Sequence, residues 1–112
     1  MTNPADRRRS ARVEVLGKIQ GQAVSLGLPV VVREISLGGM SVEPPWTFPV
    51  GSICDFLLTL GDGSAVDLLG KVVYSRPTTE DGRTFHVSGI QFVDQDDRDP
   101  DNPVGGIIDK VT

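Results

Sequence analysis

Short apolar runs, repeatedly broken by glycine, proline or aspartate, are the feature that most limits how this chain folds. The 112 residues include 13 glycines and 8 prolines, and both residue types interrupt helices and mark turns. Between these breaks, apolar residues alternate with polar ones or form β-branched runs, which is typical of strands. The pattern therefore predicts an all-β fold, and a chain of this length has room for one compact core.

Six strands are expected after a polar N-terminal segment. Their ranges are 13–20, 29–37, 40–43, 53–60, 65–75 and 84–93. Gly61-Asp62-Gly63 and Asp81-Gly82 have the turn chemistry of hairpins. The segment PPWTFPVG at 44–51 is not a central strand, because proline lacks the N–H that a ladder needs. Antiparallel strands joined by such turns can close into a barrel.

The N-terminal segment 1–12 is too polar to pack as core and ends in a basic cluster. We expect it to form a flexible arm ahead of a barrel that spans 13–94. The arginines of the arm are Arg7, Arg8, Arg9 and Arg12.

The remaining residues, 95–112, form an acidic C-terminal tail in this division of the chain. Five aspartates and one arginine lie in 94–101, a composition typical of a solvated stretch. Beyond Pro103 the sequence VGGIIDKV fits a short turn of helix or a strand, with Ile107 and Ile108 covering an opening of the barrel.

Charge and cysteine content exclude several functions. A net charge of −4 makes nucleic acid an unlikely partner, because non-specific affinity for it comes from neutralising many phosphates. The single cysteine, Cys54, cannot form an internal disulfide, so a reducing, cytoplasmic location is expected. No apolar stretch has the length of a membrane span or of a secretory signal, so membrane insertion is not expected.

Two motifs stand out. Arg8 and Arg12 have R-x-x-x-R spacing where the arm meets the first strand, and Glu34-Ile35-Ser36-Leu37-Gly38-Gly39 ends the second strand. With Gly89-Ile90-Gln91-Phe92 downstream, they resemble the PilZ domain family, whose second motif is [D/N]-x-S-x-x-G. The resemblance implies a six-stranded antiparallel β-barrel that binds the bacterial second messenger cyclic di-GMP. It implies a receptor that signals through a partner protein, in which cyclic di-GMP is a ligand and not a catalytic cofactor.

The resemblance also implies roles for individual residues. Arg8 and Arg12 would grip guanine edges and phosphates, with Arg7 and Arg9 beside them. The chemistry is suitable, because the guanidinium fork matches the O6 and N7 acceptors of guanine and pairs with phosphate.

The second motif supplies the other half of the expected site. Glu34 and Ser36 project from one face of their strand, where they can hydrogen-bond guanine, while Ile35 points into the core. The pair Gly38-Gly39 permits positive φ and a close approach by the ligand.

One position departs from the family pattern and leaves an alternative open. Glu34 stands where the family has Asp or Asn, which lengthens the side chain by about 1.5 Å. The alternative is a degenerate PilZ-like adaptor, in motility or secretion machinery, that does not bind cyclic di-GMP. Trp46 is then either an exposed anchor for a partner or part of a loop packed on the barrel.

Catalytic and metal chemistry are not expected. His86 is the only histidine and has no Cys or second His near it in the sequence, so neither a zinc site nor a Ser–His pair can be built. The aspartates do not follow the EF-hand pattern.

Overall fold

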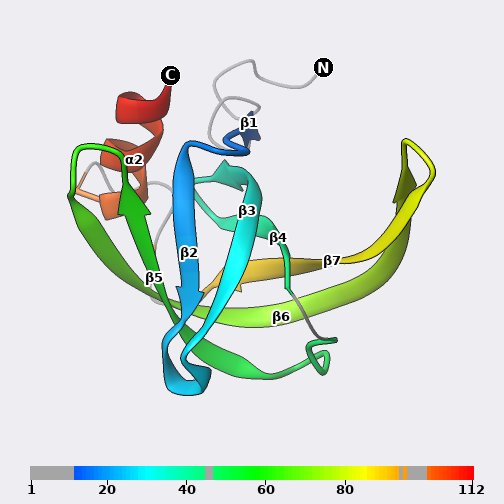
Figure 1. Ribbon diagram of the computed structural model, residues 1–112. Helices are drawn as coiled ribbons and strands as arrows, with labels where there is room; N and C mark the ends of the chain where they lie inside the picture. The colour runs from blue at the N-terminus through cyan, green and yellow to red at the C-terminus, as the bar shows by residue number, and fades with distance from the viewer. Residues whose placement is uncertain (1–11, 45–46, 94, 96–100) are drawn as a thin grey trace, which may run out of the picture.

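The computed structural model describes residues 12–44, 47–93, 95 and 101–112, and within them it confirms the all-β prediction (Figure 1). The elements in chain order are β1 (Val13–Glu14), β2 (Ile19–Ala23), the 3₁₀ turn η1 (Val24–Leu26), β3 (Leu28–Ser36), β4 (Gly39–Glu43), β5 (Ile53–Leu60), β6 (Ala65–Glu80), β7 (Arg83–Phe92) and α2 (Pro103–Val111).

The strands form one antiparallel sheet that closes on itself. Its order is β1-β3-β2-β5-β6-β7-β4, and β3 also pairs with β4. Strands β2 to β7 therefore make a six-stranded barrel, as predicted, and the short β1 is an additional strand on β3. Closure leaves the barrel strands with few open edges.

Alternation of buried and exposed residues places the core inside the barrel. In β2, Ile19 and Ala23 are buried while Gln20 and Gln22 are exposed, and β5 buries Phe56 and Leu58 completely. Since successive side chains of a strand point to opposite faces, each strand contributes every second residue to one shared core.

The first two strands differ from the prediction of a single strand over 13–20. The chain turns after β1, where Gly17 has a φ of 83° and the amide of Lys18 donates to the carbonyl of Val15 at 2.8 Å. Glycine adopts this left-handed conformation at little cost, so the chain leaves β3 after Glu14, which is opposite Glu34, and pairs with it again from Gln20, which is opposite Val31.

The hairpin of β6 and β7 is longer than predicted and projects from the barrel as a curved two-stranded ribbon (Figure 1). The prediction ended the strand at Ser75, before Pro77. Pro77 instead pairs with His86 of β7, and β5 no longer accompanies β6 there because its pairing ends at Lys71. Proline is tolerated where a strand has a free edge. The predicted Asp81-Gly82 turn is confirmed, with φ values of 51° and 79°.

Two β-bulges interrupt the regular ladders. The register of β3 against β4 shifts between Val32 and Glu34, and that of β6 against β7 shifts between Val72 and Tyr74. The first bulge lets Val32 and Ile35, three positions apart, both be fully buried. Bulges re-aim side chains, and both lie beside the pocket described below.

The helix α2 closes one end of the barrel. Asn102 is its N-cap and accepts a hydrogen bond from the amide of Val104 at 2.9 Å, and Pro103 suits the first turn. Val104 and Ile107 are buried in the core and Ile108 packs against it, which agrees with the predicted covering role. Most of the acidic stretch 94–101 lies outside the described residues. None of the described helices is long and apolar enough to cross a bilayer.

Candidate ligand site

A pocket of about 240 Å³ brings together residues from both sequence motifs. Arg12 lies on it, immediately before β1, and so do Ser36, Gly38 and Gly39 from the turn between β3 and β4. The opposite wall comes from the bulge of β6 and from β7. Motifs far apart in the sequence thus meet because β1 and β4 both pair with β3.

The turn between β3 and β4 is fixed by its own contacts. The hydroxyl of Ser36 donates to the carbonyl of Gly39 at 3.3 Å, and the carbonyl of Gly38 accepts from the amide of Phe92 at 2.9 Å. These bonds hold the turn against β7 before any ligand arrives.

The reason for glycine in this turn differs from the prediction. Neither Gly38 nor Gly39 uses the positive φ that glycine permits. A Cβ on Gly39 would overlap the carbonyl oxygen of Ile90, whereas one on Gly38 would meet nothing within 4 Å. Gly39 is required because β4 approaches β7 closely, and Gly38 leaves the mouth of the pocket open.

An aromatic side chain that the sequence reasoning missed forms part of the pocket wall. The ring of Tyr74 lies over Gly89, where any Cβ would overlap it. The guanidinium carbon of Arg76 is 4.9 Å from the ring centroid, a distance at which a cation is attracted to the ring. The feature that could have revealed it is Tyr74 opposite Gly89 in the ladder. The bulge at Val73 breaks the regular alternation of the strand, so this pairing could not be predicted from the sequence pattern.

The structure leaves Glu34 beside the pocket and does not make it part of the lining. Ile35 is fully buried, as predicted, and Glu34 is half-buried. In the ladders Glu34 stands opposite Glu14 of β1 and Ser41 of β4. Like charges directly opposite each other are unfavourable, and neither carboxylate has an ion-pair partner in the described part of the chain.

The other predicted arginines, Arg7, Arg8 and Arg9, lie outside the described residues. Arg12 is the member of the arm that the structure places, and it is exposed. Trp46 also falls outside the described residues.

Three buried hydroxyls are concentrated in the strands that form the pocket. Ser41 of β4, Ser75 of β6 and Ser88 of β7 have no hydrogen-bond partner among the described residues. Ser75 and Ser88 face each other across the hairpin, and Ser41 is opposite Gly89. A buried hydroxyl without a partner is costly, so this side of the barrel keeps polar groups that the core packing does not need.

A charged cluster ties the projecting hairpin to β3. Arg33, at the bulge, contacts Glu43 at 3.2 Å and Glu80 at 2.7 Å, and Arg83 contacts Glu43 at 2.6 Å. Both guanidinium groups lie over the ring of Phe85, at 4.9 and 4.1 Å. The hydrogen bond from Arg83, helped by Arg33, lowers the pKa of Glu43 below its usual value against the opposing effect of burial. The cluster holds the hairpin in its curve.

The comparisons with known proteins agree with this architecture. The family model of the PilZ domain matches residues 6–106, which is most of the chain and includes Arg12 and the turn between β3 and β4. The chain belongs to the PilZ domain family. No match was found among the curated proteins.

The fold of this PilZ domain is shared with a solved structure of low sequence identity. It is similar to the PilZ domain, with c-di-GMP, of YcgR from Escherichia coli, with a TM-score of 0.69 and 16% identity. The likeness covers 94% of this chain and 91% of that one, so the two share the whole domain fold. Within the described residues of this PilZ domain, no three His, Cys, Asp or Glu side chains gather as a metal site.

Proposed function

We propose that this PilZ domain is a receptor that binds cyclic di-GMP in the pocket between the β3–β4 turn and β7. The observation that carries the proposal is the meeting of Arg12 with Ser36, Gly38 and Gly39 around one pocket. It is supported by family membership and by the c-di-GMP bound to the related YcgR domain.

The chemistry of the pocket suits a guanine dinucleotide. Arg12 presents a fork of donors for guanine O6 and N7 or for phosphate, and Arg7, Arg8 and Arg9 precede it in the sequence. Ser36 offers a hydroxyl, and the ring of Tyr74 with Arg76 beside it offers a surface on which a base can stack. A local cluster of arginines explains how a chain of net charge −4 attracts an anion.

Glu34 has a secondary role in this proposal. It shares a face with Ser36, so its carboxylate can accept from the N1 and N2 donors of a guanine that extends past the pocket toward β1. Glu34→Asp should then retain binding and Glu34→Ala should weaken it.

Binding in this receptor couples to signalling through the arm. The arginines of the arm close over the pocket when the ligand arrives and so present a different surface to a downstream protein. The domain acts by binding and not by catalysis. We place it in the cytoplasm, a location in keeping with the free thiol of Cys54.

Calorimetric titration of the whole chain with cyclic di-GMP tests the proposal. Wild type should release or absorb heat with a saturable isotherm, and Arg12→Ala should lose about tenfold or more in affinity, since each good arginine–guanine contact is worth roughly 1–3 kcal/mol. Arg8→Ala should behave likewise.

Two controls sharpen that titration. Arg12→Lys keeps the charge and loses the fork, so it should fall between wild type and Arg12→Ala. Lys18→Ala removes a cation away from the pocket and should leave affinity unchanged. Absence of heat for wild type at high-micromolar ligand would overturn the proposal.

A second candidate function is an adaptor that binds a protein and not the nucleotide. The observation in its favour is Glu14 opposite Glu34. These two carboxylates have no ion-pair partner among the described residues, and they repel a phosphate that approaches this part of β3. A pull-down of partners from motility or secretion machinery distinguishes this adaptor from the cyclic di-GMP receptor. The adaptor loses its partner with Trp46→Ala and keeps it with Arg8→Ala, whereas the reverse pattern counts against it.

A further inference from the structure

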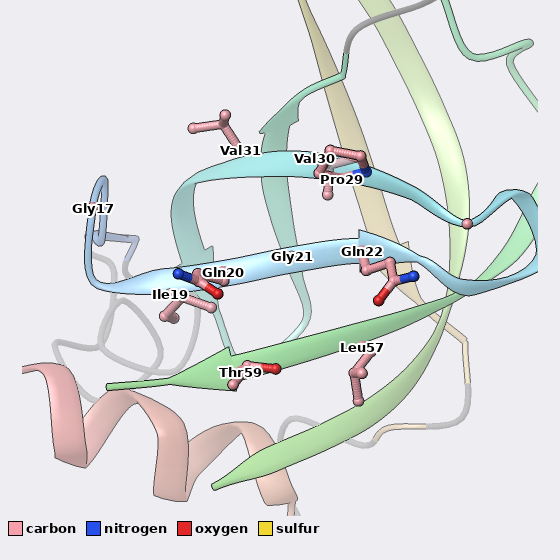
Figure 2. Close-up of a pocket in the computed structure, with 11 residues that line it drawn as sticks. Gly17, Ile19, Gln20, Gly21, Gln22, Pro29, Val30, Val31, Leu57 and Thr59 are labelled. Atoms are coloured by element: carbon pink, nitrogen blue, oxygen red, sulfur yellow. The ribbon is translucent and has the colours of Figure 1, made fainter. Parts of the chain in front are cut away.

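A second hollow, of about 500 Å³, lies on the outer surface of β2, β3 and β5, away from the ligand pocket (Figure 2). We call this surface the neutral face. Six outward positions form it, two on each strand: Gln20, Gln22, Pro29, Val31, Leu57 and Thr59. None of them carries a charge, in a chain where 23% of the residues are charged.

Apolar side chains frame the neutral face at both ends. Leu16, in the turn before β2, is 57% exposed, while Leu26, in the turn after β2, is 53% exposed. Val31, on the face itself, is 45% exposed. Large side chains exposed together around a hollow are characteristic of an interaction surface.

Charged residues surround the face: Glu43 stands opposite Val31 and Asp67 opposite Leu57 along its sides, and the two ends along the strands carry opposite sign. Lys18 precedes β2 at one end, and Asp55, at the start of β5, lies at the other, about 20 Å away along the strands. Within the part of the chain that the structure describes, the ammonium of Lys18 donates to the backbone carbonyl of Val111, at 3.2 Å. The carboxylate of Asp55 has no partner in the described ranges.

We propose that the neutral face binds a second copy of this chain, with the two β2 strands antiparallel. A two-fold axis that lies between the two faces and runs across the strands places the Lys18 end of each copy over the Asp55 end of the other. Because Asp55 is on the strand next to β2, the two residues are offset sideways by about one strand spacing, 4.8 Å. The parallel arrangement would set Lys18 against Lys18. The antiparallel one also places Leu26 of each copy near Leu16 of its partner.

Self-complementarity at the centre supports a second copy over an unrelated protein. In the antiparallel arrangement Gln20 of one copy faces Gln22 of the other, twice. A glutamine amide both donates and accepts, so these side chains can pair with each other, and neither has a hydrogen-bond partner in the part of the chain described here.

Sedimentation equilibrium of the whole chain over a range of concentrations tests the interface. Wild type should show a reversible dimer, and Val31→Asp should be monomeric because the new carboxylate is buried without a partner in the dimer. Val50→Asp is the matched control: Val50 is 63% exposed and lies off the neutral face, so this variant should dimerise as wild type does. Thermal unfolding verifies that all three are folded.

A charge swap identifies the antiparallel arrangement. Lys18→Glu and Asp55→Lys should each weaken the dimer about tenfold, because a two-fold axis places every substitution in the interface twice. The double variant should recover most of the affinity. A wild type that stays monomeric at high-micromolar concentration, or a double variant weaker than both single ones, overturns the proposal.

The dimer does not depend on cyclic di-GMP. Binding of the nucleotide by Val31→Asp should equal that of wild type, because the residue lies away from the ligand pocket. Loss of nucleotide binding in this folded variant would mean that the neutral face belongs to the ligand site, and would also overturn the proposal.

Discussion

Strand β3 contributes to two outer faces of the barrel that are built differently. On the neutral face, β2 pairs with β3 and with β5 without any register shift. On the site face, formed by β3, β4, β7 and β6, two bulges interrupt the ladders, and the hairpin runs on beyond the barrel (Figure 1). The difference teaches that the irregular ladders lie on the side where a ligand is proposed to bind, and that one of them, β3–β4, also closes the barrel.

The two faces also differ in how they treat polar groups. The neutral face has no charged residue among its outward positions. The site face holds the Arg33–Glu43–Arg83 cluster and the three buried hydroxyls that have no partner among the described residues. Substitutions in matched pairs can test how much each of these features contributes to the stability of the fold.

Gly39→Ala should give the largest loss of stability. The added Cβ meets the backbone of β7 at Ile90, which cannot move without breaking the ladder, so we expect a loss of about 2–3 kcal/mol. Gly21→Ala on β2 meets methyl groups of Val30 and Val32 at 2.8 and 2.9 Å and the carbonyl oxygen of Val30 at 3.2 Å, a less severe overlap that should cost less. Gly38→Ala should change the unfolding free energy little. Urea denaturation of the three variants checks the order, and equal losses at Gly39 and Gly38 would contradict it.

Arg33→Ala should have the next largest effect. It removes the contacts to Glu43 and Glu80 and one cation over Phe85, in a site where the side chain of Arg33 is only 17% exposed. We expect a loss of about 1–2 kcal/mol. Arg76→Ala, which removes an exposed arginine stacked on one ring, is the control and should cost less. The denaturant midpoint should fall further in Arg33→Ala than in Arg76→Ala, and equal midpoints would contradict the prediction.

The same cluster should make stability depend on pH. Contact with Arg83 lowers the pKa of Glu43 from its ordinary value of 4.5, so the folded state favours the ionised carboxylate. The contribution is fully present above pH 4.5 and is lost as the pH falls through the lowered folded-state pKa. Unfolding measured from pH 6 to acid should show this loss in wild type and less of it in Arg83→Ala. An unchanged profile in that variant would assign the dependence to other carboxylates.

Asn102→Ala tests how α2 is attached to the site face. The side chain caps α2 through Val104 and donates to the carbonyl of Leu37 at 3.3 Å, so the turn that carries Ser36 and Gly39 touches the helix. Loss of an N-cap costs about 1 kcal/mol. Hydrogen exchange should speed up in α2 and leave β2 and β5 as they were. Thr112→Ala, at the other end of the helix, is the control, and protection of α2 equal to wild type would contradict the role of Asn102.

The smallest effect is expected at the turn between β5 and β6. Hydrogen bonds from the side chain and backbone of Ser64, with Lys110 at 3.1 Å, lower the pKa of Asp62 to about 2. The pair contributes stability above the ordinary carboxyl pKa and loses it as the pH falls toward 2. An NMR titration of the Asp62 carboxyl should show the low value. Ser64→Ala should raise it toward 3.8, and a titration unchanged by that variant would rule out Ser64 as the cause.

Part of the candidate site was open to sequence reasoning. Arg12, Ser36, Gly38 and Gly39 were named from their motifs, and the structure places all four on one pocket. Tyr74 and Arg76 were missed because a bulge separates them from the regular alternation. Glu34 was named, but its place is set by the pairing of β1 with β3, a contact between segments that motifs do not specify.

The sequence by itself determined most of the local choices: that strands form in these parts of the chain, where Asp81-Gly82 turns it, and that buried and exposed residues alternate along the strands. These follow from side-chain period and turn chemistry, which act over a few residues. Only the tertiary structure decided that β3 pairs with β4 to close the barrel, that Gly39 lies against Ile90, and that Arg33 reaches Glu80. Those contacts join residues distant in the chain, and they form only when the whole barrel is assembled.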